Sequence, residues 1–356
     1  MSSSTSSSDP RAPAAWRRFF RLAAGTAAVV ACVIYAFVVL VDPWNILPFS
    51  PPLDRVPVTG NQRFSYPSLA RSPAFDSAIF GASTVRLLRP ATLNQEFDAR
   101  FANLAMNDAT VYEISRLYQV FIRAHPAPKV IMLGLDVRSC ATGDAYQQLT
   151  SRPFPAWMYR THLWRGYADM FNLFAVQEAG KEFGVLTGLK AEDMGRDGYT
   201  RFVPPDSDYD AARALMHLRQ EDRVVPPGPH FGDPAGWRFP ALETLRDDLA
   251  RLPASTRKVL LFVPYNRHLM SPPGSPTAAV WDECKRRVAV MAQAIPDSVV
   301  VDFLLPSPIT DTDTNYWDGQ HYRVEAADLL ARDLATANRG QSGADYRILF
   351  RSTPQP

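Results

Sequence analysis

An uncharged, apolar run of twenty residues, 22–41, lies close to the start of the chain. At about 1.5 Å per residue, a helix of this length spans the ~30 Å hydrocarbon core of a bilayer. Three of the five residues before the run are arginine, and Asp42 follows it. Because basic flanks stay in the cytoplasm, this pattern predicts a cytoplasmic N-terminus and an extracytoplasmic, periplasmic remainder. We therefore expect a single-pass protein of the cytoplasmic (inner) membrane, with residues 1–21 as a disordered cytoplasmic tail that has a basic flank.

Two other structures could contain such a run. A cleaved signal peptide would have a shorter apolar region followed by a small-x-small cleavage site. The chain continues as Val-Asp-Pro-Trp-Asn from residue 41 and has no such site there. A buried core helix is rarely uncharged over twenty residues beside an arginine cluster. The run therefore predicts an uncleaved membrane anchor.

Composition limits the function classes open to the rest of the chain. The 356 residues suffice for one large domain or two small ones. The net charge is +2, and basic residues do not cluster outside the N-terminus, which argues against nucleic-acid binding. Cys32, Cys140 and Cys284 form no CxxC pair, so we expect no zinc site and no redox motif. Cys140 and Cys284 could pair in an oxidising compartment or remain buried thiols.

The chain after the anchor divides into three further regions. Residues 42–74 are rich in proline and predict an extended linker. In residues 75–340, short apolar runs alternate with helical patterns, which is typical of an α/β fold with a parallel sheet. Residues 341–356 would form a C-terminal tail. The expected strands are residues 77–80, 101–104, 129–135, 258–263 and 298–303, and the expected helices are residues 110–124, 240–252, 278–294 and 324–337. These elements predict a three-layer sandwich around a central parallel sheet of about five strands.

The alternation breaks over residues 140–238. An unstructured loop of that length would be unusual, so we expect a helical insertion over one edge of the sheet. The interval contains a run of aromatic residues: Phe154, Trp157, Tyr159, Trp164, Tyr167, Phe171 and Phe174. They could pack the insertion internally, stack on sugars or contact the membrane interface.

Ser83 is the first candidate for chemistry. It follows the apolar strand that ends at Phe80, and ligands of open α/β sheets bind at the carboxyl ends of strands. Its small neighbours Gly81 and Ala82 would let a substrate approach. Gly-Ala-Ser is also common in ordinary turns, so this motif alone does not identify Ser83 as a catalytic residue.

The second feature is Asp318-Gly319-Gln320-His321, directly before the last expected helix. A serine hydroxyl is a poor nucleophile unless a base removes its proton, and that base must be held in the right tautomer. An acid three residues before a histidine can reach its Nδ1 while Nε2 faces a pocket. The alternative is a helix-capping aspartate beside a surface histidine.

Together the two features resemble the SGNH (GDSL-like) hydrolase superfamily. More narrowly, they resemble its membrane-anchored bacterial branch, which includes alginate O-acetyltransferase-like proteins. The resemblance covers residues 42 to about 334 but not the insertion. It rests on Asp42-Pro43, Gly81-Ala82-Ser83, Asn103-Leu104-Ala105 with Tyr112-Glu113, Leu133-Gly134-Leu135-Asp136, and Asp302-Phe303 followed by Asp318-Gly319-Gln320-His321.

The resemblance implies roles for the catalytic residues. Ser83 would be the nucleophile, His321 the general base and then acid, and Asp318 the residue that orients His321. The family's oxyanion hole consists of the serine N–H, a glycine N–H in the second block and an asparagine side chain in the third.

This sequence departs from the family at both later blocks. The second reads Met106-Asn107-Asp108-Ala109 without glycine, and the third has Asp136 in place of asparagine. An ionised carboxylate cannot donate to an oxyanion. Asp136 is therefore either protonated through burial, or ionised and paired, for example with Arg138 or Arg86.

Three more residues complete the candidate oxyanion or substrate-binding group. Asn107 could supply the missing donor, and Asp108 lies beside it in the chain. Arg86 could bind an anionic group of the substrate or form a salt bridge at the start of a helix.

The expected function is acyl-ester chemistry on a cell-envelope carbohydrate, either O-acetyl transfer or deacetylation. No metal or organic cofactor is implied. The implied partners are a polysaccharide or acylated sugar, the membrane through residues 22–41, and other envelope assembly proteins, but no nucleic acid. The alternatives are a catalytically silent SGNH-like scaffold in an envelope assembly, and a structural membrane protein with coincidental motifs.

Overall fold

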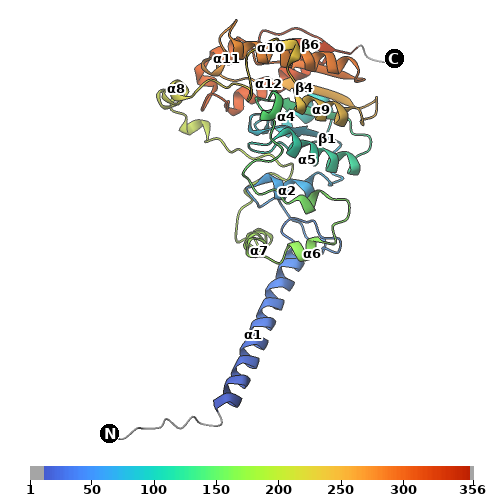
Figure 1. Ribbon diagram of the computed structural model, residues 1–356, viewed down its shortest axis with the longest axis vertical. Helices are drawn as coiled ribbons and strands as arrows, with labels where there is room; N and C mark the ends of the chain where they lie inside the picture. The colour runs from blue at the N-terminus through green and yellow to red at the C-terminus, as the bar shows by residue number, and fades with distance from the viewer. Residues whose placement is uncertain (1–11, 353–356) are drawn as a thin grey trace. The chain divides into compact units, whose positions relative to one another are not determined.

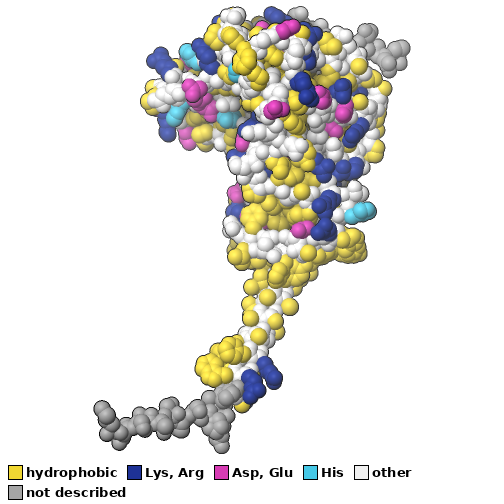
Figure 2. All heavy atoms as spheres, viewed as in Figure 1, with side chains coloured by type: hydrophobic (Ala, Val, Ile, Leu, Met, Phe, Trp, Pro, Cys, Tyr) yellow, Lys and Arg dark blue, Asp and Glu magenta, His cyan; other side chains and the backbone are white. Residues whose placement is uncertain are grey.

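The computed structural model describes residues 12–352, and it begins with α1, Ala12–Val41. Within α1, residues Ala14–Val41 are long and apolar enough to cross a membrane. Figure 2 shows hydrophobic side chains along α1 and basic side chains near its N-terminal end. Residues 12–21, expected as part of a disordered tail, are helical, because residues such as Ala, Arg and Leu favour helix. Residues 1–11 of that tail lie outside the described residues.

The chain forms two compact units, and the first combines Met1–Arg55 with His162–Ala191. Besides α1 it contains α6 (Gly166–Asp169) and α7 (Leu173–Leu186), and α7 packs on α1. Directly after α1, the carboxylate of Asp42 accepts hydrogen bonds from the N–H groups of Ile46 (2.9 Å) and Leu47 (3.0 Å). These bonds close a turn whose apolar side chains are buried.

The second unit consists of Val56–Thr161 and Glu192–Pro356. It includes α2 (Gln62–Leu69), which Asn61 caps through its side chain. Residues 42–74 therefore do not form the extended linker predicted: their first part folds into the first unit and the rest into the second. The abundant prolines had obscured the apolar residues that this segment buries.

The second unit is built on one sheet of six strands, in the order β2-β1-β3-β4-β5-β6. The first five strands are parallel, as expected, and β6 is antiparallel to β5. Their bounds are β1 Ser77–Phe80, β2 Phe101–Asn103, β3 Val130–Leu135, β4 Arg257–Phe262, β5 Ser298–Asp302 and β6 Arg347–Arg351. The fold is thus α/β with a mixed, mostly parallel sheet. The part of residues 341–356 that is described is not a tail, because it contributes the sixth strand.

Helices lie on both faces of this sheet (Figure 1). After β1 the chain moves to β2 on one side, whereas later crossovers run the other way, so right-handed connections place their helices on opposite faces. Accordingly α4 contacts α12, and α5 contacts α9. The α-helices of this unit, besides α2, are α3 Ser83–Arg86, α4 Pro90–Phe97, α5 Val111–Ala124, α8 Ala211–Gln220, α9 Pro240–Leu249, α10 Pro276–Gln293, α11 Pro308–Asp311 and α12 Val324–Asn338. Its 3-10 helices are η1 Gly143–Ala145, η2 Ala156–Tyr159, η3 Asp206–Asp208, η4 Pro234–Gly236, η5 Arg267–Leu269 and η6 Asp313–Asn315.

The reversal of direction falls between the neighbouring strands β1 and β3. In open α/β sheets such a switch point leaves a crevice at the carboxyl ends of the strands, where ligands bind. Ser83 follows β1 and Asp136 follows β3, so both lie at this point.

The interval 140–238, expected as one insertion, is divided between the units. His162–Ala191 belongs to the first unit, and the remainder belongs to the second. In the second unit, Cys140 and Cys284 form a disulfide with a Cα–Cα distance of 5.7 Å, which ties the loop after β3 to α10. Cys32, on α1, is a free and exposed thiol.

Candidate active site

Ser83, His321 and Asp318 form a continuous chain of hydrogen bonds. The Ser83 Oγ lies 2.9 Å from the His321 Nε2, although 238 residues separate them in sequence. The His321 Nδ1 lies 2.8 Å from Oδ2 and 3.0 Å from Oδ1 of Asp318. A carboxylate can only accept, so Nδ1 carries the proton and donates to Asp318. Nε2 is then unprotonated and can accept from the serine hydroxyl. The sequence therefore identified three residues that the fold brings together.

Close packing under α3 fixes the position of Ser83. Gly81 has a φ of +150°, and a Cβ there would lie 2.3 Å from the Val85 side chain. A Cβ on Gly134, in β3, would lie 2.5 Å from the same side chain. Both glycines thus let α3 sit directly on the ends of β1 and β3. This packing, rather than the substrate access predicted from sequence, is what requires glycine at position 81.

The loop that carries His321 is held by its own backbone and by the serine side of the site. The Asp318 Oδ1 accepts hydrogen bonds from the N–H groups of Gln320 (2.9 Å) and His321 (2.8 Å). The buried Tyr322 donates from its hydroxyl to the carbonyl oxygen of Thr84, at 2.6 Å. The loop that carries His321 is therefore joined directly to α3, the helix that begins at Ser83.

Asp318 is held in its ionised form. Burial by itself would raise the pKa of this carboxyl, but the hydrogen bond and charge of His321 and two backbone N–H groups lower it below its ordinary value. An ionised carboxylate on Nδ1 keeps the imidazole in the tautomer that a general base needs.

Glu221 contacts this loop from the segment after α8. Its Oε2 accepts a hydrogen bond from the Gly319 N–H at 3.1 Å. Burial, and then the nearby charge of Asp318, raise the pKa of Glu221 above its ordinary value. No pattern in the sequence predicts this contact, because Glu221 lies 98 residues before Gly319 and outside any motif.

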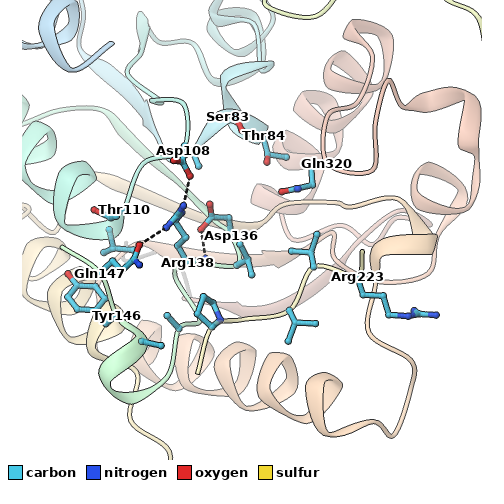
Figure 3. Close-up of a pocket in the computed structure, with 18 of the residues that line it drawn as sticks. Ser83, Thr84, Asp108, Thr110, Asp136, Arg138, Tyr146, Gln147, Arg223 and Gln320 are labelled. Carbon is cyan, nitrogen blue, oxygen red and sulfur yellow. Dashed lines mark hydrogen bonds and ion pairs between the residues drawn. The ribbon is translucent and has the colours of Figure 1, made fainter. Parts of the chain in front are cut away.

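Ser83 and His321 open onto a pocket of about 690 Å³. Asp108 and Asp136 lie in its wall, together with Arg138 and Gln147 (Figure 3). The Arg138 guanidinium forms an ion pair with Asp108, and its Nη1 donates to the Gln147 Oε1 at 3.2 Å. Further lining residues are Ala82, Thr84, Thr110, Val111, Val137, Ala141, Ala145, Tyr146, Asp222, Arg223, Val224, Val225, Pro227 and Gln320. The wall thus presents many hydrogen-bonding groups between apolar side chains.

Asp136 is almost fully buried, and its carboxylate binds the turn that follows β3. Its Oδ1 accepts from the backbone N–H of Arg138 (3.0 Å) and of Ser139 (3.3 Å). Burial raises the pKa of Asp136, although these hydrogen bonds oppose the shift. The expected pairing with an arginine side chain is wrong, because Arg138 pairs with Asp108 and Arg86 bonds to Asn107.

Arg86 and Asn107 lie beside the pocket rather than in its wall. Arg86 is 2% exposed, and its Nη1 donates to the Asn107 Oδ1 at 2.7 Å. Its guanidinium also lies over the Phe202 ring, 4.9 Å from the centroid, and that ring meets the His321 ring edge-on at 5.4 Å. Among residues 12–352, no carboxylate forms an ion pair with Arg86, so the salt bridge considered from sequence is absent. The hydrogen bond from Arg86 holds the Asn107 amide oxygen, and the NH₂ group lies on the opposite side of the same amide.

A buried ion pair supports the loop that contains Asn107 and Asp108. Arg63 and Glu113 are both fully buried, and two hydrogen bonds of 2.9 and 2.5 Å join them. Arg63 also donates to the Asn107 carbonyl oxygen at 3.1 Å. Glu113 completes a capping box with Thr110 at the start of α5. Such a pair is costly to break on one side, which keeps the loop rigid.

In the described part of the chain, no group of three or more His, Cys, Asp or Glu side chains could hold a metal ion. A comparison of the chain with known protein families and with curated proteins finds no match.

Proposed function

We propose that this protein is a membrane-anchored serine esterase or O-acyltransferase of the SGNH type, which acts on an acyl ester of a cell-envelope carbohydrate. The observation that carries the proposal is the hydrogen-bonded chain from Ser83 through His321 to Asp318, with distances of 2.9 and 2.8 Å. Its position at the switch point of the sheet, facing a pocket of about 690 Å³, also supports it.

The reaction starts when the Ser83 Oγ attacks the ester carbonyl carbon and His321 takes the hydroxyl proton. The tetrahedral intermediate collapses, His321 returns this proton to the leaving sugar oxygen, and Ser83 carries the acyl group. Water or an acceptor hydroxyl then attacks the acyl-enzyme and gives its proton to His321, which returns it to Ser83. Water yields hydrolysis and an acceptor hydroxyl yields transfer, so exclusion of water decides between them.

The oxyanion would be bound by the Ser83 N–H, and the Asn107 NH₂ group is the candidate for the donor that this chain lacks relative to the family. Asp136 can donate only while protonated, a form that its burial favours. A carbohydrate suits the pocket because Asp108, Gln147 and Tyr146 offer hydrogen-bonding groups to hydroxyls.

The proposed location is the outer side of the cytoplasmic membrane. Three arginines before the apolar part of α1 favour a cytoplasmic N-terminus. The disulfide between Cys140 and Cys284 gives independent support, because structural disulfides persist in oxidising compartments.

A catalytically silent scaffold in an envelope assembly is the second candidate. The observation that favours it is the state of the expected oxyanion donors. Asp136 stands where the superfamily has an amide and accepts from two backbone N–H groups, and Asn107 lies beside the pocket rather than in its wall.

The deciding test is labelling of the detergent-solubilised full chain with a fluorophosphonate probe. We expect the parent protein and Ser207→Ala, an exposed serine outside the pocket, to be labelled equally. Ser83→Ala should not be labelled, and His321→Ala only weakly. A folded parent protein that resists the probe would refute the esterase and leave the scaffold.

A further inference from the structure

Helix α7 in the first unit buries charged side chains and exposes apolar ones, the reverse of a surface helix in a soluble protein. Glu178 and Glu182 are fully buried, whereas Leu173 is 87% exposed and Phe171, just before the helix, is 67% exposed. A surface helix in water turns its apolar stripe inward and its charges outward. The opposite arrangement indicates that the outer face of α7 meets an apolar medium.

The buried acidic face of α7 has a polar environment inside the unit. Glu178 accepts a hydrogen bond from Lys181 at 2.6 Å, and the charge of Glu182 acts on Arg55. Arg55 in turn donates to the Val41 carbonyl oxygen at the end of α1, at 2.5 Å. The buried carboxylates thus face charged side chains of the unit, whereas the apolar side chains at the start of α7 are exposed.

This apolar face continues that of α1. The Phe171 ring lies 5.5 Å from Tyr35, and the Phe183 ring lies 5.6 Å from Phe37. An apolar groove of about 270 Å³ lies between the two helices. Figure 2 shows that hydrophobic side chains extend from α1 over the region where Figure 1 labels α6 and α7.

The position along α1 gives the depth of the contact. Tyr35 lies six residues before Val41, or ~9 Å along the helix axis. Figure 1 shows α7 nearly end-on beside α1, so the two axes cross steeply. If α1 crosses the bilayer, α7 therefore lies along its surface, at the 5–10 Å depth that interfacial helices reach.

Further aromatic side chains lie in the segments that contact this end of α1. Trp164 and Phe49 are exposed and lie 5.0 Å apart, and the Tyr35 hydroxyl donates to the Tyr167 carbonyl oxygen at 2.5 Å. Trp and Tyr are enriched at the boundary between acyl chains and headgroups.

We propose that residues 162–191 are a second membrane contact, in which α7 is an interfacial helix that inserts its outer face into the outer leaflet next to α1. The occupant is lipid rather than another protein, because the face continues a helix that is itself apolar enough to span the bilayer. This contact is independent of the proposed catalysis.

Spin labels on the full chain in lipid nanodiscs test the proposal. Cys32→Ala removes the free thiol and leaves the disulfide intact, so one new cysteine can be labelled at a time. Leu173→Cys is the test position. Val33→Cys in α1 serves as the lipid reference, and Glu243→Cys, exposed on α9, serves as the aqueous reference.

We expect the ratio of oxygen to nickel-chelate accessibility at position 173 to lie far above the value at 243 and below the value at 33. A ratio equal to that at 243 would place α7 in water and overturn the proposal. Low accessibility to both reagents would mean that a protein covers the face, which also overturns it. Leu189→Cys, at another exposed position of the segment, repeats the measurement if labelling at 173 disturbs folding.

Discussion

The Tyr322 hydroxyl lies 2.6 Å from the Thr84 carbonyl oxygen, and each residue directly follows a member of the Ser83–His321 pair. One buried hydrogen bond thus joins the segments that carry the proposed nucleophile and base. Tyr322 touches no reacting atom, so it is a positioning residue.

Tyr322→Phe should lower kcat by about 10-fold to 10²-fold with little change in KM, because small misplacements of catalytic groups are costly. It should also cost about 1–2 kcal/mol of unfolding free energy, since the Thr84 carbonyl loses its donor. Tyr346→Phe is the matched control, because its hydroxyl makes a similar bond to the Gln341 carbonyl oxygen (2.8 Å) away from the pocket. Equal kinetics for the two variants would show that the Tyr322 bond does not position the pair.

Ser83→Ala and His321→Ala should each lower ester turnover by about 10³-fold or more. The double variant should lose little beyond either single one, because residues that act as one unit give non-additive losses. Hydrolysis of an aryl acetate measures this, with thermal unfolding as a check on folding. Additive losses, or full activity in Ser83→Ala, would show that the two residues do not act together in one catalytic step.

Asp136→Asn should change how stability depends on pH. Burial raises the folded-state pKa of Asp136 above its unfolded value near ~3.9, so the folded protein holds this proton more tightly. The stability from this group is complete below the unfolded pKa and is lost as pH rises through the folded pKa. Asparagine cannot ionise, yet its oxygen can still accept from Arg138 and Ser139.

The Asp136→Asn variant should therefore match the parent in Tm near pH 4 and equal or exceed it near pH 8. Scanning calorimetry across this range is the measurement. A variant less stable than the parent at pH 8 but not at pH 4 would mean that the ionised carboxylate is favourable, contrary to its raised pKa.

The parts of this fold that sequence predicted are those with a strong local signal. Residues 130–135 form an unbroken apolar run, which is typical of a strand buried on both faces, and they form β3. Ser83 and His321 were found because each stands at a boundary between elements that the pattern marks. The SGNH resemblance built on them stays a prediction.

The missed parts depend on partners distant in sequence. The strand β6 is short, starts with Arg347 and ends with Arg351, and becomes a strand only by pairing with β5. Residues 162–191 looked like part of one insertion, because periodicity does not reveal that Phe171 meets Tyr35. At Asp108 φ is 54°, and aspartate is among the few residues that tolerate this left-handed conformation.

Removal of the Cys140–Cys284 disulfide should destabilise the protein by about 2–5 kcal/mol, because the bond restricts a long loop in the unfolded chain. The double variant Cys140→Ala with Cys284→Ala tests this by thermal unfolding, and Cys32→Ala serves as the control. In cells, neither Cys140 nor Cys284 of the parent protein should react with a maleimide without prior reduction. Reaction at either cysteine before reduction would contradict the oxidising compartment.

Glu221→Gln should separate the charge of this residue from its hydrogen bond. The glutamine oxygen can still accept from the Gly319 N–H, so the loop stays in place. The substitution removes a negative charge that acts on Asp318 and His321. The charge of His217 also acts on the Glu221 carboxyl. Without that charge, the positive charge that develops on His321 as it takes the Ser83 proton is less stabilised, so kcat/KM should fall at neutral pH.

The size of this loss depends on pH, because Glu221 itself titrates. Burial and the charge of Asp318 raise its pKa, so at low pH the parent carboxyl is already neutral and the two profiles should converge there. Glu221→Ala loses the hydrogen bond as well, so kcat should fall at every pH. Glu243→Gln, an exposed acid outside the pocket, controls for the overall change in charge. A Glu221→Gln profile identical to that of Glu243→Gln would leave Glu221 without electrostatic influence on the base.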